Sequence, residues 1–147
     1  MSKKSFSLIE VLLAIGIFCL IASFFIFLII SSYEINEQAR DLIIATNLAE
    51  EGIEALRSIR DINFRELASS YYSYCLAIEN NRWVLKRLSR RNFFEEIKLN
   101  NKTFFRQIYI YLISATKRKV VSVVSWQTKR GFKKEVRLFS RITNWIR

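Results

Sequence analysis

The chain has 147 residues, of which 51% are hydrophobic, and carries 24 Lys and Arg against 13 Asp and Glu, a formal net charge of +11. This length suits one modest domain with an appendage rather than two full domains. The sequence has no histidine, only two widely separated cysteines (Cys19 and Cys75) and three scattered glycines. That composition argues against a histidine-based acid–base site, a zinc site and a phosphate-binding loop. We therefore expect no catalytic residue, no metal site, no cofactor and no enzyme activity.

Residues 11–30 form an uninterrupted apolar run, VLLAIGIFCLIASFFIFLII, without a charge or an amide. Twenty residues of helix extend about 30 Å, the thickness of the hydrocarbon core of a bilayer. The apolar region of a cleaved secretory signal is usually shorter, about 7–15 residues, and ends in a small-residue cleavage site. Here a charged helical pattern follows without a break. We predict that residues 6–32 form a retained transmembrane helix in contact with lipid.

The charges that flank this run differ in sign. Lys3 and Lys4 precede it, whereas Glu34 and Glu37 are the first charges after it. The positive-inside rule then places the N-terminus in the cytoplasm and the C-terminal domain outside the plasma membrane. The two cysteines would lie on opposite sides of the membrane boundary, so we expect no disulfide between them.

Residues 33–66 have the pattern of an amphipathic helix that continues the transmembrane one. They contain no proline and one glycine, Gly52. Apolar residues recur at spacings of three and four, which places them on one helical face. The members of this predicted stripe are Leu42, Ala45, Ala49, Ile53, Leu56 and Ile59. Such a stripe must pack on another element outside the membrane.

Residues 67–147, which we call the head, carry strand patterns that predict an antiparallel sheet. The apolar alternation over 72–85 is interrupted by Asn80 and Asn81, residues typical of a tight hairpin turn. Residues 104–114, 118–127 and 132–140 are rich in aromatic and β-branched side chains. The segment SRRNFFEEIKLNNK (89–102) is interpreted as a polar connection. The predicted fold class is α+β, with the long helix packed on a sheet of about four to five strands.

The charge is unevenly distributed along the chain. Residues 34–66 hold eight acids against four arginines, whereas from residue 80 onward there are eighteen Lys and Arg against three acids. A basic head fits either a polyanion such as DNA or simply a solvated surface. The candidate polyanion-binding residues are Arg90, Arg91, Lys117, Arg118, Lys119, Lys129, Arg130, Lys133 and Lys134.

Two further patterns have both a functional and a structural interpretation. Aromatics interleaved with basic residues, as in Phe104-Phe105-Arg106, suit base stacking, but core packing is the preferred interpretation for most of them. Paired acids at Glu95-Glu96 are interpreted as local charge balance with the neighbouring arginines.

The opening KKSFSLIEVLLAIGIF (3–18) resembles the processing segment of type IV prepilins and type II secretion pseudopilins. The resemblance implies a leader over residues 1–5, cleavage between Ser5 and Phe6 by a prepilin peptidase, and N-methylation of Phe6. It also implies that Glu10, the fifth residue of the mature chain, pairs with the new α-ammonium of a neighbouring subunit. That pairing would neutralise a carboxylate that is otherwise costly beside lipid.

The remainder of the chain is similar to the minor-pilin branch of that family, in 47–64 and in 120–145, where Trp126 and Trp145 would be sheet-packing residues. The chain departs from the family pattern in three ways. Ser5 stands where glycine is usual, no proline interrupts the helix, and no cysteine pair closes a C-terminal loop.

The expected function is that of a minor pilin or pseudopilin subunit in a type IV pilus or type II secretion pseudopilus, with DNA uptake or adhesion as candidate roles. The resemblance implies that its partners are other pilin subunits, the prepilin peptidase, an inner-membrane assembly platform, lipid and, for the basic head, DNA. Its location would be the plasma membrane and then the filament. The alternative is a signal-anchored membrane protein that never polymerises and whose exterior β domain binds a partner.

Overall fold

The structure, a computed structural model, describes residues 7–67, 73–87, 94–99, 101–129 and 131–144. It contains two compact units, Met1–Arg40 and Asp41–Arg147. The residues named above that lie outside the described ranges are Lys3, Lys4, Ser5, Phe6, Arg90, Arg91, Arg130 and Trp145.

The long N-terminal helix predicted from the sequence is confirmed. Helix α1 spans Leu8–Asn63, and a short 3-10 helix, η1, follows at Phe64–Glu66. Asn63 ends the α-helix because its backbone becomes extended (φ −156°, ψ 101°) and its side chain accepts a hydrogen bond from the backbone N–H of Arg65 at 3.1 Å. This side-chain acceptor satisfies one of the free donors at the start of η1.

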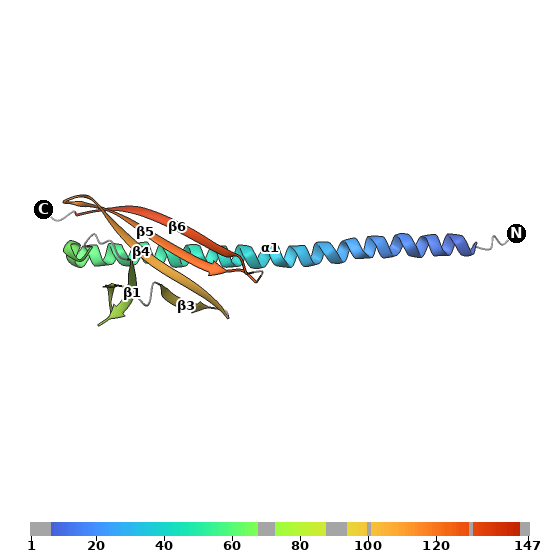
Figure 1. Cartoon of the computed structure of the whole chain (residues 1–147), viewed down its shortest axis with the longest axis horizontal. Coiled ribbons are helices and arrows are strands. Elements are labelled where there is room, and N and C mark those ends of the chain that lie inside the picture. The colour runs from blue at the N-terminus through green and yellow to red at the C-terminus, as the bar shows by residue number, and fades with distance from the viewer. Residues whose placement is uncertain (1–6, 68–72, 88–93, 100, 130, 145–147) are drawn as a thin grey trace. The chain divides into compact units, whose positions relative to one another are not determined.

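The head contains an antiparallel sheet, which confirms the α+β fold class. The strands are β1 (Tyr74–Glu79), β2 (Arg82–Arg87), β3 (Glu95–Leu99), β4 (Lys102–Ser114), β5 (Lys117–Gln127) and β6 (Lys133–Thr143). Their order is β2-β1-β4-β5-β6, and β3 pairs with β4 beside this path. Strands β4, β5 and β6 cross over α1 (Figure 1). The sheet has six strands rather than the four to five predicted.

The additional strand is β3, which lies in the segment interpreted as a polar connection. Its register pairs Ile97 with Phe104 and Glu95 with Arg106. Strand β1 pairs with the same edge of β4 as β3 does, but only at Tyr74 and Ile108. Residues 102–106 of that edge are therefore left for β3. Because β3 has few apolar residues, its own sequence gives only a weak strand signal, and the strand forms where the long β4 offers it a free edge.

Two hairpin turns depend on asparagines with positive φ. Asn80 (φ 49°) and Asn81 (φ 60°) connect β1 to β2, as the sequence predicts, and Asn101 (φ 63°) lies in the β3–β4 turn. Successive positive φ values are typical of a type I′ turn, whose twist matches that of the two strands.

The amphipathic part of α1 packs on the sheet nearly as predicted. Ala45, Ala49, Ile53, Leu56 and Ile59 are buried, with exposed fractions between 0% and 7%. Leu42, however, is 50% exposed. The prediction for Leu42 is wrong because its neighbour Asp41 is buried instead. The Asp41 carboxylate pairs with the Lys102 ammonium of β4.

The helix lies close to β4 and β5 at Gly52. A Cβ atom placed there would lie 2.6 Å from Ser122 Oγ and 3.1 Å from Ile108 Cδ1. Ser122 is fully buried, and its hydroxyl has no hydrogen-bond partner among the described residues. The hydroxyl therefore occupies the space that a side chain at residue 52 would need.

We expect Gly52→Ala to lower the free energy of unfolding by about 1–3 kcal/mol, because overpacking outweighs the roughly 1 kcal/mol gained from helix propensity. Ser122→Ala, which removes an unpartnered buried hydroxyl, should be neutral or stabilising and should reduce the Gly52→Ala penalty. Urea unfolding of the full chain in a nonionic detergent, followed by tryptophan fluorescence, measures both effects. Gly16→Ala is the matched control, since nothing lies within 4 Å of its Cβ position. A Gly52→Ala chain as stable as the unaltered one would contradict the close approach.

Candidate functional site

The first unit offers an exposed apolar helix surface. The helical region contains a window of mean hydropathy 3.0, with none of that window buried inside the structure, so by length and composition α1 can cross a membrane. Leu12, Phe18 and Leu20 are 60–73% exposed. The weakly polar Ser23 donates its hydroxyl to the Cys19 carbonyl at 2.8 Å, which satisfies it within the helix.

Glu10 lies in the first turn of α1, beside the exposed side chains of Leu8, Ile9 and Val11. Its backbone N–H donates to the Ser7 carbonyl at 2.9 Å. A carboxylate is favourable at this end of a helix because the free N–H groups there carry partial positive charge. Among the described residues, the carboxylate has no hydrogen-bond or ion-pair partner. It is therefore placed to accept a cation from outside this part of the chain.

The structure separates the described members of the candidate polyanion set. The register places Lys117, Lys119 and Lys133 on the face of the sheet opposite α1. Lys134 pairs across the strands with Trp126, on the α1 side, and Lys129 lies in the β5–β6 connection. These residues therefore do not form one patch.

Arg118 makes structural contacts. Its guanidinium donates to the Ser114 carbonyl at 2.6 Å and to the Leu67 carbonyl at 3.2 Å. It also lies 4.9 Å from the centroid of the Phe64 ring. Arg118 thus connects the β4–β5 turn to the end of the helix.

The face of β4, β5 and β6 opposite α1, which we call the outer face, combines cations with aromatic rings. Strand β4 contributes Phe105, Gln107, Tyr109 and Tyr111; β5 contributes Lys117, Lys119, Val121, Val123, Ser125 and Gln127; and β6 contributes Lys133, Glu135, Arg137, Phe139 and Arg141. Sequence reasoning missed Arg137, Phe139 and Arg141. Their alternation with Val136, Leu138 and Ile142 was the available signal.

Most aromatics of β4 lie on this outer face, contrary to the preferred interpretation as core. Phe104 is fully buried, whereas Phe105 and Tyr109 are half-buried and Tyr111 is 51% exposed. The Tyr109 and Tyr111 rings stack with centroids 6.5 Å apart. Burial raises the pKa of the Tyr109 hydroxyl, which donates to Gln107 Oε1 at 3.0 Å.

On β6, Phe139 is 75% exposed, and the Lys119 ammonium lies 5.8 Å from the centroid of its ring. Arg137 and Glu135 form an ion pair at 2.7 Å. The outer positions of β5 and β6 thus hold five cations, Lys117, Lys119, Lys133, Arg137 and Arg141, and one acid, Glu135. The outer face is therefore both basic and aromatic.

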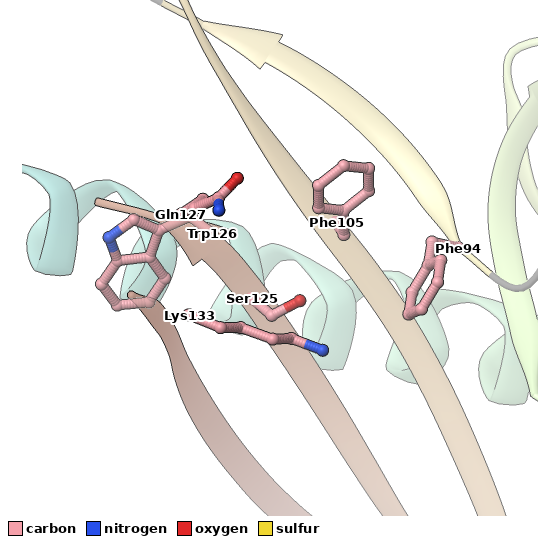
Figure 2. A pocket seen from close by; sticks show the side chains of 6 residues that line it. All are labelled: Phe94, Phe105, Ser125, Trp126, Gln127 and Lys133. Atoms are coloured by element: carbon pink, nitrogen blue, oxygen red, sulfur yellow. The ribbon is translucent and has the colours of Figure 1, made fainter. Parts of the chain in front are cut away.

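A pocket of about 290 Å³ lies at the end of the outer face near Lys133 (Figure 2). It is lined by Phe94, Phe105, Ser125, Trp126, Gln127 and Lys133. The Phe94 and Phe105 rings meet edge to face at 5.6 Å, and the Lys133 ammonium lies 5.7 Å from the Phe94 centroid. The pocket therefore presents aromatic carbon beside a single cation.

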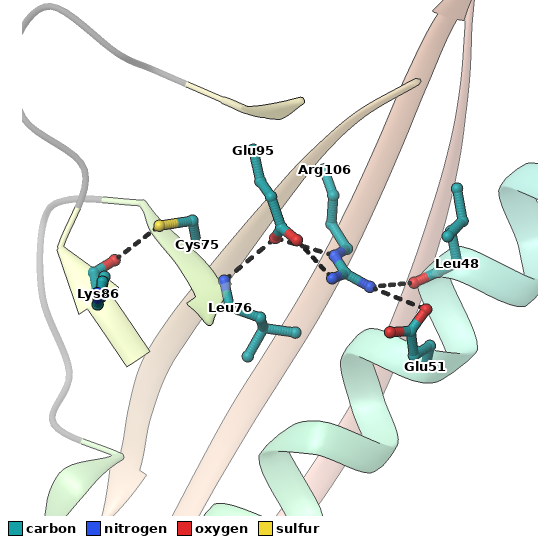
Figure 3. Close-up of polar contacts among 7 residues, drawn as sticks. All are labelled: Leu48, Glu51, Cys75, Leu76, Lys86, Glu95 and Arg106. Carbon is teal, nitrogen blue, oxygen red and sulfur yellow. Dashed lines mark hydrogen bonds and ion pairs between the residues drawn. The ribbon is translucent and has the colours of Figure 1, made fainter. Parts of the chain in front are cut away.

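A buried charged network connects the helix to the sheet (Figure 3). Arg106, whose side chain is 3% exposed, donates to both carboxylate oxygens of Glu95 at 2.6 and 3.1 Å and to the Leu48 carbonyl at 3.1 Å. Glu95 also accepts from the Leu76 backbone N–H at 3.1 Å, and Glu51 lies 3.5 Å from the guanidinium. The pairing of Glu95 with Arg106 corrects its interpretation as local charge balance.

Cys75 lacks the surroundings of a reactive thiol. Burial, followed by the Glu95 carboxylate, raises the pKa of the Cys75 thiol, which favours the protonated form. Over the described ranges, no three His, Cys, Asp or Glu side chains gather closely enough to hold a metal ion.

Comparison with known proteins gives no match to a family model, to a curated protein or to a solved structure.

We expect Arg106→Met to lower the free energy of unfolding by about 3–5 kcal/mol, because it leaves the Glu95 carboxylate largely buried without its cation. The double variant Arg106→Met/Glu95→Leu should regain most of this loss. A small deficit should remain, since the Leu76 N–H loses its acceptor. The same urea titration measures both variants. Arg137→Met, which breaks the exposed pair with Glu135, is the matched control and should change stability little. An equal cost for Arg106→Met and Arg137→Met would contradict a structural role for the buried pair.

Proposed function

We propose that the chain is a minor pilin or pseudopilin subunit, processed between Ser5 and Phe6 and assembled through its N-terminal helix into a type IV pilus or type II secretion pseudopilus. In this proposal the protein waits in the plasma membrane, with its head outside, until an assembly platform transfers it into the filament. Its partners are then other subunits of the same kind.

The observation that carries the proposal is the position of Glu10 at the edge of an exposed apolar helix. Among the described residues, its carboxylate has no ion-pair partner, and the apolar side chains around it are exposed. A carboxylate beside lipid is costly unless it is paired. Cleavage before Phe6 would create an α-ammonium of the required charge, and a neighbouring copy could supply it. Assembly would then satisfy the acid and bury the apolar surface together.

The fold supports the same proposal without requiring it. The second half of α1 packs on an antiparallel sheet, the architecture that the N-terminal motif implies. A helix that is apolar first and amphipathic afterwards can leave its first half free for lipid or for other helices. The signal-anchored binding protein remains the competing function, and it requires neither cleavage nor Glu10.

The first test is the intact mass and N-terminal sequence of the protein recovered from the membranes of its native host. We expect a mature chain that begins at Phe6 and is heavier by one methyl group. Ser5→Gly should be processed at least as completely, because glycine is usual in this motif. A chain that keeps Lys3 and Lys4 in both forms would overturn the proposal in favour of the signal-anchored protein.

A second test addresses assembly itself. Glu10→Gln keeps the size of the side chain and removes its charge, so we expect the protein to remain in the membrane fraction and to be lost from sheared filaments. Glu96→Gln, a matched change at an exposed acid of β3, should leave incorporation unaltered. Equal incorporation of both variants would show that the Glu10 charge has no part in assembly.

A further inference from the structure

We propose that the outer face of β4, β5 and β6 binds single-stranded nucleic acid, with bases stacked on its aromatic rings and phosphates held by its cations. Beyond the pair Lys117–Thr143 at one end, the sheet register arranges this face in five cross-strand rows. In order, they are Tyr111–Lys119–Arg141, Tyr109–Val121–Phe139, Gln107–Val123–Arg137, Phe105–Ser125–Glu135 and Gln127–Lys133.

Cations and aromatic rings both recur along the face. The first, third and fifth rows supply cations, and the first, second and fourth supply the rings of Tyr111, Tyr109, Phe139 and Phe105. Neighbouring rows on one face of a sheet are two residues apart, about 6–7 Å. The face therefore presents cations and rings close together along its length, so a flexible strand could place phosphates on the cations and bases on the rings.

The exposed rings favour unpaired bases over a duplex. Phe139 and Tyr111 are 75% and 51% exposed, so each offers much of its ring to a ligand. A duplex keeps its bases stacked inside and would present only phosphates to these rings, whereas a single strand can stack its bases on aromatic side chains. The pocket between Phe94, Phe105 and Lys133 would hold one further base beside a cation.

The cations of this face can reach phosphates. Lys119 contacts the Phe139 ring in a weak, solvent-exposed cation–π interaction, which it can exchange for a phosphate when a base stacks on that ring. Arg141 lies in the same row as Lys119, next to Phe139 along β6. The ion pair of Arg137 with Glu135 leaves the charge in the middle of the face partly balanced.

Every residue of this face belongs to the head. Binding here is therefore independent of filament assembly and should survive Glu10→Gln. A variant that loses assembly but still binds nucleic acid, or one that assembles but no longer binds it, would separate the proposed function from the proposed binding.

The test uses the full chain in a nonionic detergent and a fluorescein-labelled oligo-dT, with binding followed by fluorescence anisotropy over a range of salt concentrations. We expect Phe139→Ala to raise the Kd about tenfold or more, since it removes a stacking platform. Lys119→Gln should make the plot of log affinity against log salt shallower by about 0.7 for the lost phosphate contact. Phe139 is exposed, so its removal leaves the core intact, and circular dichroism verifies this.

Matched variants distinguish binding by the outer face from the general effect of losing one cation or one exposed aromatic side chain elsewhere. Lys86→Gln removes one cation on the β1–β2 hairpin, and Tyr33→Ala removes an exposed aromatic on α1. Lys86→Gln should weaken oligo-dT binding only slightly, through the loss of one distant charge, and Tyr33→Ala should leave it unchanged. Heparin, which carries charge but no bases, should bind the unaltered and Phe139→Ala proteins equally.

Three results would overturn the proposal. The first is the absence of oligo-dT binding at low salt, and the second is equal or tighter binding of a duplex of the same length. The third is oligo-dT binding that Phe139→Ala and Tyr33→Ala leave equally unaffected. Preference for oligo-dT over the duplex, with selective loss in Phe139→Ala, would support it.

Discussion

The arrangement of the head depends on one buried guanidinium, that of Arg106. Burying a charge is costly, and the cost is offset only when its hydrogen bonds are complete. Glu95 supplies two acceptors and the Leu48 carbonyl a third, while Glu95 also accepts from the Leu76 N–H. The network therefore connects α1, β1, β3 and β4. A shift of β3 by one residue along β4 would move Glu95 to the other face, so the pair also specifies the register.

Close packing of the helix on the sheet decides which side chains remain outside. Gly52 and the small residues Ala45 and Ala49 let the helix backbone approach β5, where Ser122 is fully buried. Once this face of the sheet is covered, the alternation of the strands places Phe105, Tyr109 and Phe139 on the opposite face. The aromatic rings therefore lie on the outer face because the helix covers the other face and side chains alternate between the two faces along each strand.

The two candidate surfaces differ in the medium that each suits. The first half of α1 exposes a uniformly apolar surface with one acid at its edge, which suits lipid or other helices. The outer face of the sheet exposes rings among cations, which suits a flexible anionic polymer in water. The buried network at Arg106 contributes to neither surface and stabilises the head that carries the second.

The sequence alone determined the features that arise from local periodicity. The long helix, its buried stripe from Ala45 to Ile59, the turn at Asn80 and Asn81, and the long strands were predicted because their signals lie within a few consecutive residues. Only the tertiary structure decided what depends on distant partners. Strand β3 forms because β4 offers it a free edge, and Asp41 replaces Leu42 in the interior because Lys102 lies opposite. Arg118 contacts backbone carbonyls, whereas Lys119, its neighbour, faces outward beside Phe139. Pairing across the sheet joins residues far apart in the chain, and no local pattern records which residue will lie opposite.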